Sequence, residues 1–98
     1  MTGPKFDEEI HAPVRLRICG MLAAVTSMDF ATIRDTLGLA DSVVSKHLAR
    51  LEGTGYVFIE KIADIGRPRT WISLTRKGRT AFESHIAALQ EIATSAGL

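Results

Sequence analysis

A run of twelve residues, 40–51, places basic and short polar side chains where they could meet an anionic polymer. If the run is helical at about 100° per residue, its apolar side chains form one narrow stripe. That stripe consists of Val44, Leu48 and Leu51. The opposite face has no carboxylate and carries Ser42, Val43, Lys46, Ala49 and Arg50. Small residues allow close approach to the major groove, and Lys and Arg bind phosphates or guanine edges, so this pattern predicts a DNA-reading helix.

The predicted DNA-contacting residues of this helix are Ser42, Val43, Ser45, Lys46, His47 and Arg50. Val43 is notable because an exposed valine on a polar face can contact a thymine methyl group. His47 lies on the flank, about 60° from the apolar stripe. Two roles stay open for this histidine: contact with a phosphate, or local packing and hydrogen bonding.

A second basic site follows the helix. Residues 56–62 are aromatic and β-branched and predict a strand, and residues 70–74 predict the returning strand. The turn between them, 64–69, contains Arg67 and Arg69 on either side of Pro68. Two guanidinium groups on a stiff hairpin can enter a narrow minor groove, where the potential is most negative. We therefore predict DNA contacts for both arginines.

The charges of the chain are unevenly distributed. Residues 42–79 hold eight Lys and Arg against three Asp and Glu, whereas the rest of the chain holds four against eight. The net charge of +1 conceals this separation. A local excess of five positive charges predicts a polyanionic partner for this part of the chain.

Helices are expected before this basic region. Pro13 is well placed to begin one, with apolar residues at helical spacing after it. Asp29 can cap the next helix, and Gly38 can end it in a left-handed conformation. The helix over 41–52 has Ala40 before it, which cannot cap through its side chain, so Asp41 is predicted to cap instead.

The last helix is expected to begin after Thr75 and to present an apolar stripe. Its members recur at helical spacing and are Phe82, Ile86, Leu89 and Ala93, widened by Ile92. The predicted order is three helices, two strands and a helix. This is an α+β fold, mainly α: a winged helix-turn-helix domain with a three-helix core, a two-stranded wing and a C-terminal helix, spanning 1–98 as one domain.

The sequence resembles small single-domain winged helix-turn-helix transcriptional regulators of the MarR/ArsR-like group. The matching stretches are residues 11–18, the segment SVVSKHLARLEGTGYV from Ser42, and the segment GRPRTWISLTRKGR from Gly66. The resemblance implies a sequence-specific regulator that binds double-stranded DNA and dimerises through its terminal helices. A homodimer is also expected because the first long helix and the last helix have apolar faces wider than the small core can cover.

Other functions have less support in the sequence. No nucleophile–base pair or carboxylate pair suggests catalysis, so no enzyme activity and no cofactor are expected. Cys19 is predicted to be a buried small hydrophobe. No apolar run is long enough to span a membrane, and no signal peptide is recognisable, which favours a cytoplasmic location.

Two alternatives remain open: a winged-helix protein-interaction module, and a metal or thiol sensor that uses Cys19 and His85. The metal alternative lacks a second ligand pair, since residues 94–97 are Thr, Ser, Ala and Gly. No metal site is therefore predicted, and the sequence identifies no small-molecule effector.

Overall fold

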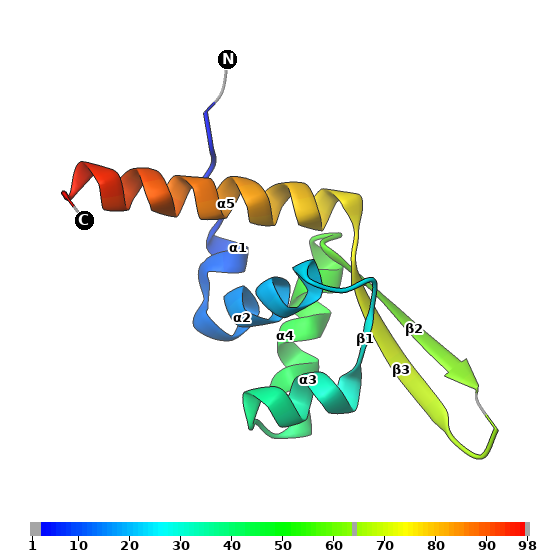
Figure 1. The fold of residues 1–98 in the computed structure, drawn as a ribbon. Helices are drawn as coiled ribbons and strands as arrows, with labels where there is room; N and C mark the ends of the chain where they lie inside the picture. Colours follow the sequence, from blue (N-terminus) through cyan, green and yellow to red (C-terminus); the bar gives the residue numbers. More distant parts are fainter. Residues whose placement is uncertain (1–2, 64, 98) are drawn as a thin grey trace.

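A computed structural model describes residues 3–63 and 65–97 of the chain (Figure 1). Five helices and a small antiparallel sheet confirm the predicted winged helix-turn-helix fold. The elements in chain order are α1 (Glu8–His11), α2 (Pro13–Ala23), β1 (Met28–Asp29), α3 (Phe30–Leu37), α4 (Asp41–Gly53), β2 (Val57–Ala63), β3 (Pro68–Leu74) and α5 (Arg76–Ser95). In Figure 1, α5 lies across one end of the molecule, and the β2–β3 hairpin projects at the other. Within the described residues, no helix has both the length and the apolar composition needed to cross a membrane.

The sheet contains a strand that the sequence did not predict. Its strand order is β1-β3-β2, and both pairings are antiparallel. Ile72 of β3 lies opposite Met28 on one side and Ile59 on the other. A two-residue strand such as β1 has too few residues to show a period, which explains why it was missed.

The second strand of the wing begins earlier than the sequence predicted. Strand β3 begins at Pro68, two residues earlier than expected, so that Pro68 pairs with Ala63 and Arg69 with Ile62. Arg69 is therefore a strand residue, and the prediction that placed it in the turn was wrong. Proline is tolerated at the first position of a strand. Asp64, also predicted to lie in this turn, is outside the described residues.

The core gathers one face of each helix against the sheet. Val44, Leu48 and Leu51 are almost fully buried, as predicted from their spacing. Cys19 is completely buried, which confirms its predicted role. Within the described residues, the buried apolar cluster is Ile10, Ile18, Cys19, Leu22, Ile33, Leu37, Val44, Leu48, Leu51, Val57 and Ile72.

Three of the predicted helix ends are confirmed. Pro13 is the first residue of α2. Gly38 ends α3 with φ 66°, a left-handed conformation that favours glycine. The Thr75 hydroxyl oxygen accepts a hydrogen bond from the Gly78 N–H at 2.9 Å and caps α5.

The starts of α3 and α4 differ from each other. Asp29 holds the N-cap position of α3 as predicted, and its carboxylate accepts from the Thr32 hydroxyl. The cap predicted for α4 was wrong. Ala40 holds the N-cap position of α4 without a side-chain cap, and Asp41 is the first helical residue. The Asp41 carboxylate instead accepts from Arg34 at 3.0 Å, which ties the start of α4 to α3.

The apolar stripe of α5 is only partly covered by the core, as its width predicted. Phe82, Ile86, Leu89 and Ala93 are only half-buried, and Ile92 is 55% exposed. The buried positions of this helix are Gly78, His85 and Ala88. The far half of α5 extends beyond the helical core (Figure 1), and Ile92 in this part of the helix is exposed.

Gly78 is required where α5 begins. A Cβ atom at this position would lie 2.0 Å from the Tyr56 carbonyl oxygen, far inside van der Waals contact. The close approach seats the start of α5 against the end of the α4–β2 connection, where Thr75 N–H also donates to the Tyr56 carbonyl. This packing sets the direction in which α5 leaves the sheet.

We predict that Gly78→Ala lowers the free energy of unfolding by roughly 1–3 kcal/mol because the methyl group overlaps backbone atoms. Gly20→Ala is the matched control, since its Cβ would meet only Phe82 Cζ, at 3.8 Å. That change at an exposed helix position should stabilise by roughly 0.5–1 kcal/mol. Urea unfolding measures both variants, and a neutral Gly78→Ala would contradict the close approach.

Candidate nucleic-acid interface

Helix α4 presents a continuous exposed face. Ser42, Val43, Ser45 and Lys46 are exposed, and Val43 retains 39% of its accessible surface. They lie opposite the buried stripe, and residues 38–40 form the short connection from α3. This is the helix-turn-helix arrangement, in which the second helix is free to enter a groove. The structure therefore brings these four predicted residues together on one accessible surface.

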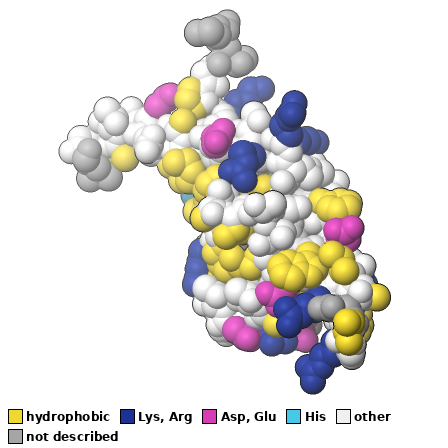
Figure 2. All heavy atoms as spheres, turned by 45° about the vertical axis from the view of Figure 1, so that its right-hand side comes forward, with side chains coloured by type: hydrophobic (Ala, Val, Ile, Leu, Met, Phe, Trp, Pro, Cys, Tyr) yellow, Lys and Arg dark blue, Asp and Glu magenta, His cyan; other side chains and the backbone are white. Residues whose placement is uncertain are grey.

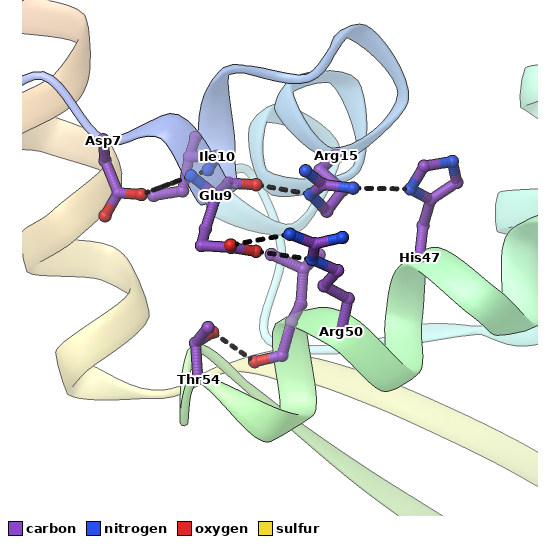
Figure 3. A network of polar contacts seen from close by, with 8 residues as sticks. Asp7, Glu9, Ile10, Arg15, His47, Arg50 and Thr54 are labelled. Atoms are coloured by element: carbon purple, nitrogen blue, oxygen red, sulfur yellow. Dashed lines mark hydrogen bonds and ion pairs between the residues drawn. The ribbon is translucent and has the colours of Figure 1, made fainter.

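Arg50 lies farther along α4 and is paired within the protein. Its Nε and Nη2 donate to the two carboxylate oxygens of Glu9, at 2.8 Å and 2.9 Å (Figure 3). This hydrogen bond from Arg50 is the main cause that lowers the pKa of the Glu9 carboxyl and raises that of Arg50. Because the Arg50 side chain is still 57% exposed, a DNA phosphate can compete with Glu9 for it.

His47 is half-buried and has a partner from α2. Arg15 Nη1 lies 3.0 Å from His47 Nδ1, and Arg15 Nε donates to the carbonyl oxygen of Glu9 (Figure 3). Burial lowers the pKa of His47, and the positive charges of Arg15, Lys46 and Arg50 lower it further. Of its two predicted roles, local hydrogen bonding is therefore present in the structure.

The wing carries the second basic group. Arg67 and Arg69 are both exposed, and basic side chains are visible at the wing end of the molecule in Figure 2. Arg67 follows Gly66, whose φ of 93° makes the turn. The Thr32 hydroxyl is the main cause of a lowered pKa at Asp29, and the charge of Arg69 adds to it. Arg69 thus lies near the start of α3, while Arg67 remains at the tip.

The outer face of the sheet is partly apolar. The sequence of β2 did not decide which side is buried, and the structure turns Val57 inward. Phe58 and Ile62 face out, 56% and 43% exposed, and Trp71 on β3 is half-buried beside them. They line a shallow groove between the wing strands and Ser27.

The two residues of the sensor alternative, Cys19 and His85, lie in different environments and have different partners. Cys19 is in the core, and burial raises its thiol pKa to about 11. His85 is completely buried, with Nδ1 accepting the Asp7 N–H at 2.9 Å and Nε2 lying 3.1 Å from His11 Nδ1. Burial is the main cause that lowers the pKa of His85. Among residues 3–63 and 65–97, no three His, Cys, Asp or Glu lie close enough to hold a metal ion.

Sequence reasoning missed two residues at this interface. Glu9, on a short helix about 40 residues away in sequence, contacts Arg50 of α4, and no local sequence pattern predicts this contact. Arg15 could have been noticed, because it falls at helical spacing with the buried residues Ile18, Cys19 and Leu22. An arginine on an apolar stripe needs a buried partner, and here the partners are a carbonyl oxygen and a histidine.

These features define a class: a winged-helix domain with an accessible polar and basic face on its second helix-turn-helix helix. Residues 14–93 match the family described as a winged helix DNA-binding domain, and the chain belongs to that family. An uncharacterised protein of Methanocaldococcus jannaschii is 32% identical over 82 residues, which are 84% of this chain and 89% of that protein.

Solved structures agree with this assignment. A transcriptional regulator homologue from Pyrococcus horikoshii is 26% identical, with a TM-score of 0.89 over 94% of this chain and 91% of that one. A MarR-family regulator from Enterococcus faecalis has the same fold, with 20% identity and a TM-score of 0.79 over 91% and 80% of the two chains. The predicted resemblance to small winged-helix regulators is thus confirmed.

We predict that the Cys19 thiol is nearly inert in the folded protein. A pKa raised from 9.0 to about 11 leaves about 100-fold less thiolate than an ordinary cysteine at pH 8, and the thiolate is the nucleophile. Alkylation by iodoacetamide, followed by mass spectrometry, should be at least that much slower than in urea. The exposed control is Ala24→Cys in a Cys19→Ala background. Equal rates in the two folded proteins would revive the thiol-sensor alternative.

Proposed function

We propose that this protein is a sequence-specific DNA-binding transcriptional regulator that acts as a homodimer, with 1–98 working as one domain. The observation that carries the proposal is the exposed face of α4, which offers Ser42, Val43, Ser45 and Lys46 opposite a buried apolar stripe. In this proposal α4 enters the major groove and the wing contacts the backbone or the minor groove. The family assignment supports DNA binding. The location we propose for this regulator is the cytoplasm.

His47 and Arg50 complete the proposed set together with Arg67 and Arg69. Arg50 would exchange the carboxylate of Glu9 for a phosphate oxygen, because both are anionic acceptors that suit a guanidinium. Arg67 is placed best for the minor groove, since it lies at the tip of the wing. Arg69 is set back in β3 and suits the backbone of the same groove.

The homodimer part of the proposal rests on α5. Its apolar side chains are only half-buried, and Ile92 is exposed where the helix extends past the core (Figure 1). A second copy would cover this side with the same residues in a two-fold arrangement. Such a dimer would read a palindrome whose half-sites lie about one turn of DNA apart.

One observation favours a protein-interaction module as the second candidate. Phe58 and Ile62 are exposed on the outer face of the sheet, where an apolar partner could pack. The charge distribution argues for the first candidate, because residues 42–79, which include the exposed face of α4 and the wing, have an excess of five positive charges. Measuring how binding depends on salt separates the two candidates.

We predict salt-sensitive binding to duplex DNA. If a dimer neutralises roughly six to eight phosphates, the logarithm of the association constant should fall against the logarithm of salt with a slope of about −5 to −7. Fluorescence anisotropy of a labelled duplex between low and physiological salt measures the slope. Absence of binding at low salt, or a flat response, would reject the DNA proposal and favour the interaction module.

Base-reading and backbone-holding residues should separate on mutation. Lys46→Ala should reduce the preference for operator over random DNA by about 1–3 kcal/mol if Lys46 contacts a base. The double variant Arg67→Ala, Arg69→Ala should weaken binding to both DNAs and reduce the slope by about 1 for each phosphate that the wing no longer neutralises. Lys5→Ala, which removes a charge beside α5, is the control. Full affinity in the wing variant would show that the wing assignment is wrong.

We predict that Ile92→Glu weakens the dimer on the order of 100-fold. Ile92 is 55% exposed in the protomer, so each copy would lose about half of the roughly 1.5–3 kcal/mol for full burial, and the two-fold axis doubles this loss to roughly 1.5–3 kcal/mol. Gln90→Glu makes a similar charge change at an exposed site on the same helix and should keep the dimer. Sedimentation equilibrium measures the dissociation constant of the dimer for the wild-type protein and both variants. A 10.7 kDa species for the intact protein at micromolar concentration would refute the dimer.

A further inference from the structure

We propose that Arg15 is a positioning residue that holds His47 as a neutral ring, with Nδ1 accepting a hydrogen bond and the Nε2–H left to donate to DNA. The inference rests on the proposed function, because it assigns His47 one kind of contact within that interface. The group recognised is a neutral hydrogen-bond acceptor on a base edge, or a phosphate oxygen. Both supply the same chemistry, an acceptor atom within reach of one oriented N–H.

The geometry dictates the tautomer. A guanidinium has five N–H donors and no acceptor, so the 3.0 Å contact between Arg15 Nη1 and His47 Nδ1 requires a lone pair on Nδ1. A neutral imidazole has one N–H, which must then be on Nε2. Figure 3 shows the ring of His47 with Nδ1 towards Arg15 and its second nitrogen on the far side. Among the described residues, Nε2 makes no hydrogen bond.

Arg15 is itself held in place. The residue is only 8% exposed, on a helix face shared with the fully buried Ile18 and Cys19. Its Nε donates to the carbonyl oxygen of Glu9, so the guanidinium is fixed from one side by α1 while it donates to α4 on the other. A donor fixed in this way orients the imidazole as well as selecting its tautomer.

The positive charges around His47 also favour the neutral form of its ring. Arg15 comes from α2, and Lys46 and Arg50 lie on α4 itself. The carboxylate of Glu9, on α1, is engaged by Arg50. Burial and the three cations lower the pKa of His47 below its usual 6.5. The ring is therefore neutral at physiological pH, and its hydrogen bond with Arg15 is fully present above about pH 6.5 and disappears as pH falls through the lowered pKa.

His47 should differ from the other basic residues of the interface in its response to salt. Lys46 and the wing arginines bring positive charge and release counterions when they bind phosphates. A neutral N–H releases none, so the contribution of His47 should not depend on salt. This difference gives the test a readout that a loss of charge or a general loss of folding would not reproduce.

The first experiment examines the free protein. Long-range ¹H–¹⁵N correlation spectra of histidine-labelled protein at pH 7.5 should show His47 with Nε2 protonated and Nδ1 bare. Arg15→Met should abolish this fixed tautomer and return the pKa of His47 towards 6.5, whereas Arg17→Met, at an exposed site on the same helix, should change neither. A proton on Nδ1 in the intact protein overturns the proposal, whether or not Arg15→Met folds.

The second experiment examines DNA binding with two variants of His47. His47→Phe removes the donor and should weaken binding roughly three- to tenfold without changing the salt slope. His47→Gln places an amide N–H near the Nε2 position and should keep most of the affinity. If His47→Phe loses affinity only for a selected operator, the acceptor is on a base edge. If it loses affinity equally for random duplex, the acceptor is a phosphate oxygen.

Failure of the donor role of His47 can be distinguished from failure of the proposed function. If His47→Phe keeps the wild-type affinity and salt slope on both DNAs, the donor role is overturned and the proposed function is unaffected. If the wild-type protein binds no duplex at low salt, both the proposed function and the donor role fall. The tautomer held by Arg15 is decided separately, by the spectra of the free protein.

Discussion

Burial of the apolar stripe of α4 is the constraint on which the interface depends. Val44, Leu48 and Leu51 can leave water together only if the helix is turned to one rotational setting, because they share a narrow range of its circumference. That setting also exposes Ser42 and Lys46 on the opposite side. The core and the recognition face are therefore two consequences of the same packing, and a change that rotated α4 would damage both.

The N-terminal segment connects the candidate DNA-binding helix to the last helix. Its residue Asp7 caps α1 by accepting from two backbone N–H groups and also accepts from the Tyr56 hydroxyl, which raises the pKa of that hydroxyl to about 12. The Asp7 N–H donates to His85 of α5, while Glu9 binds Arg50 of α4. One short segment thus spans both helices, and the buried His85 and half-buried His47 are each held by a partner from another element.

In the fold, the basic part of the sequence forms the exposed face of α4 and the wing. The chain keeps an excess of basic residues between 42 and 79, and the exposed part of α4 and the wing both come from that range. Glu9, from the acidic part of the chain, is used internally and occupies Arg50. An exposed ion pair of this kind contributes little to stability, so its replacement by a phosphate requires little energy. The free protein can thus hold Arg50 in order while keeping it available for binding.

Local patterns in the sequence determined the helices, the wing, the Gly38 and Thr75 helix ends and the exposed face of α4, because each depends on residues only a few positions apart. Tertiary structure alone decided which side of β2 is buried, where β3 begins and how far α5 extends past the core, since these depend on partners distant in the chain. It alone brought Arg15 and Glu9 to α4. Long-range contacts such as these carry no local period, and so the tautomer of His47 and the pairing of Arg50 emerge only when the helices pack.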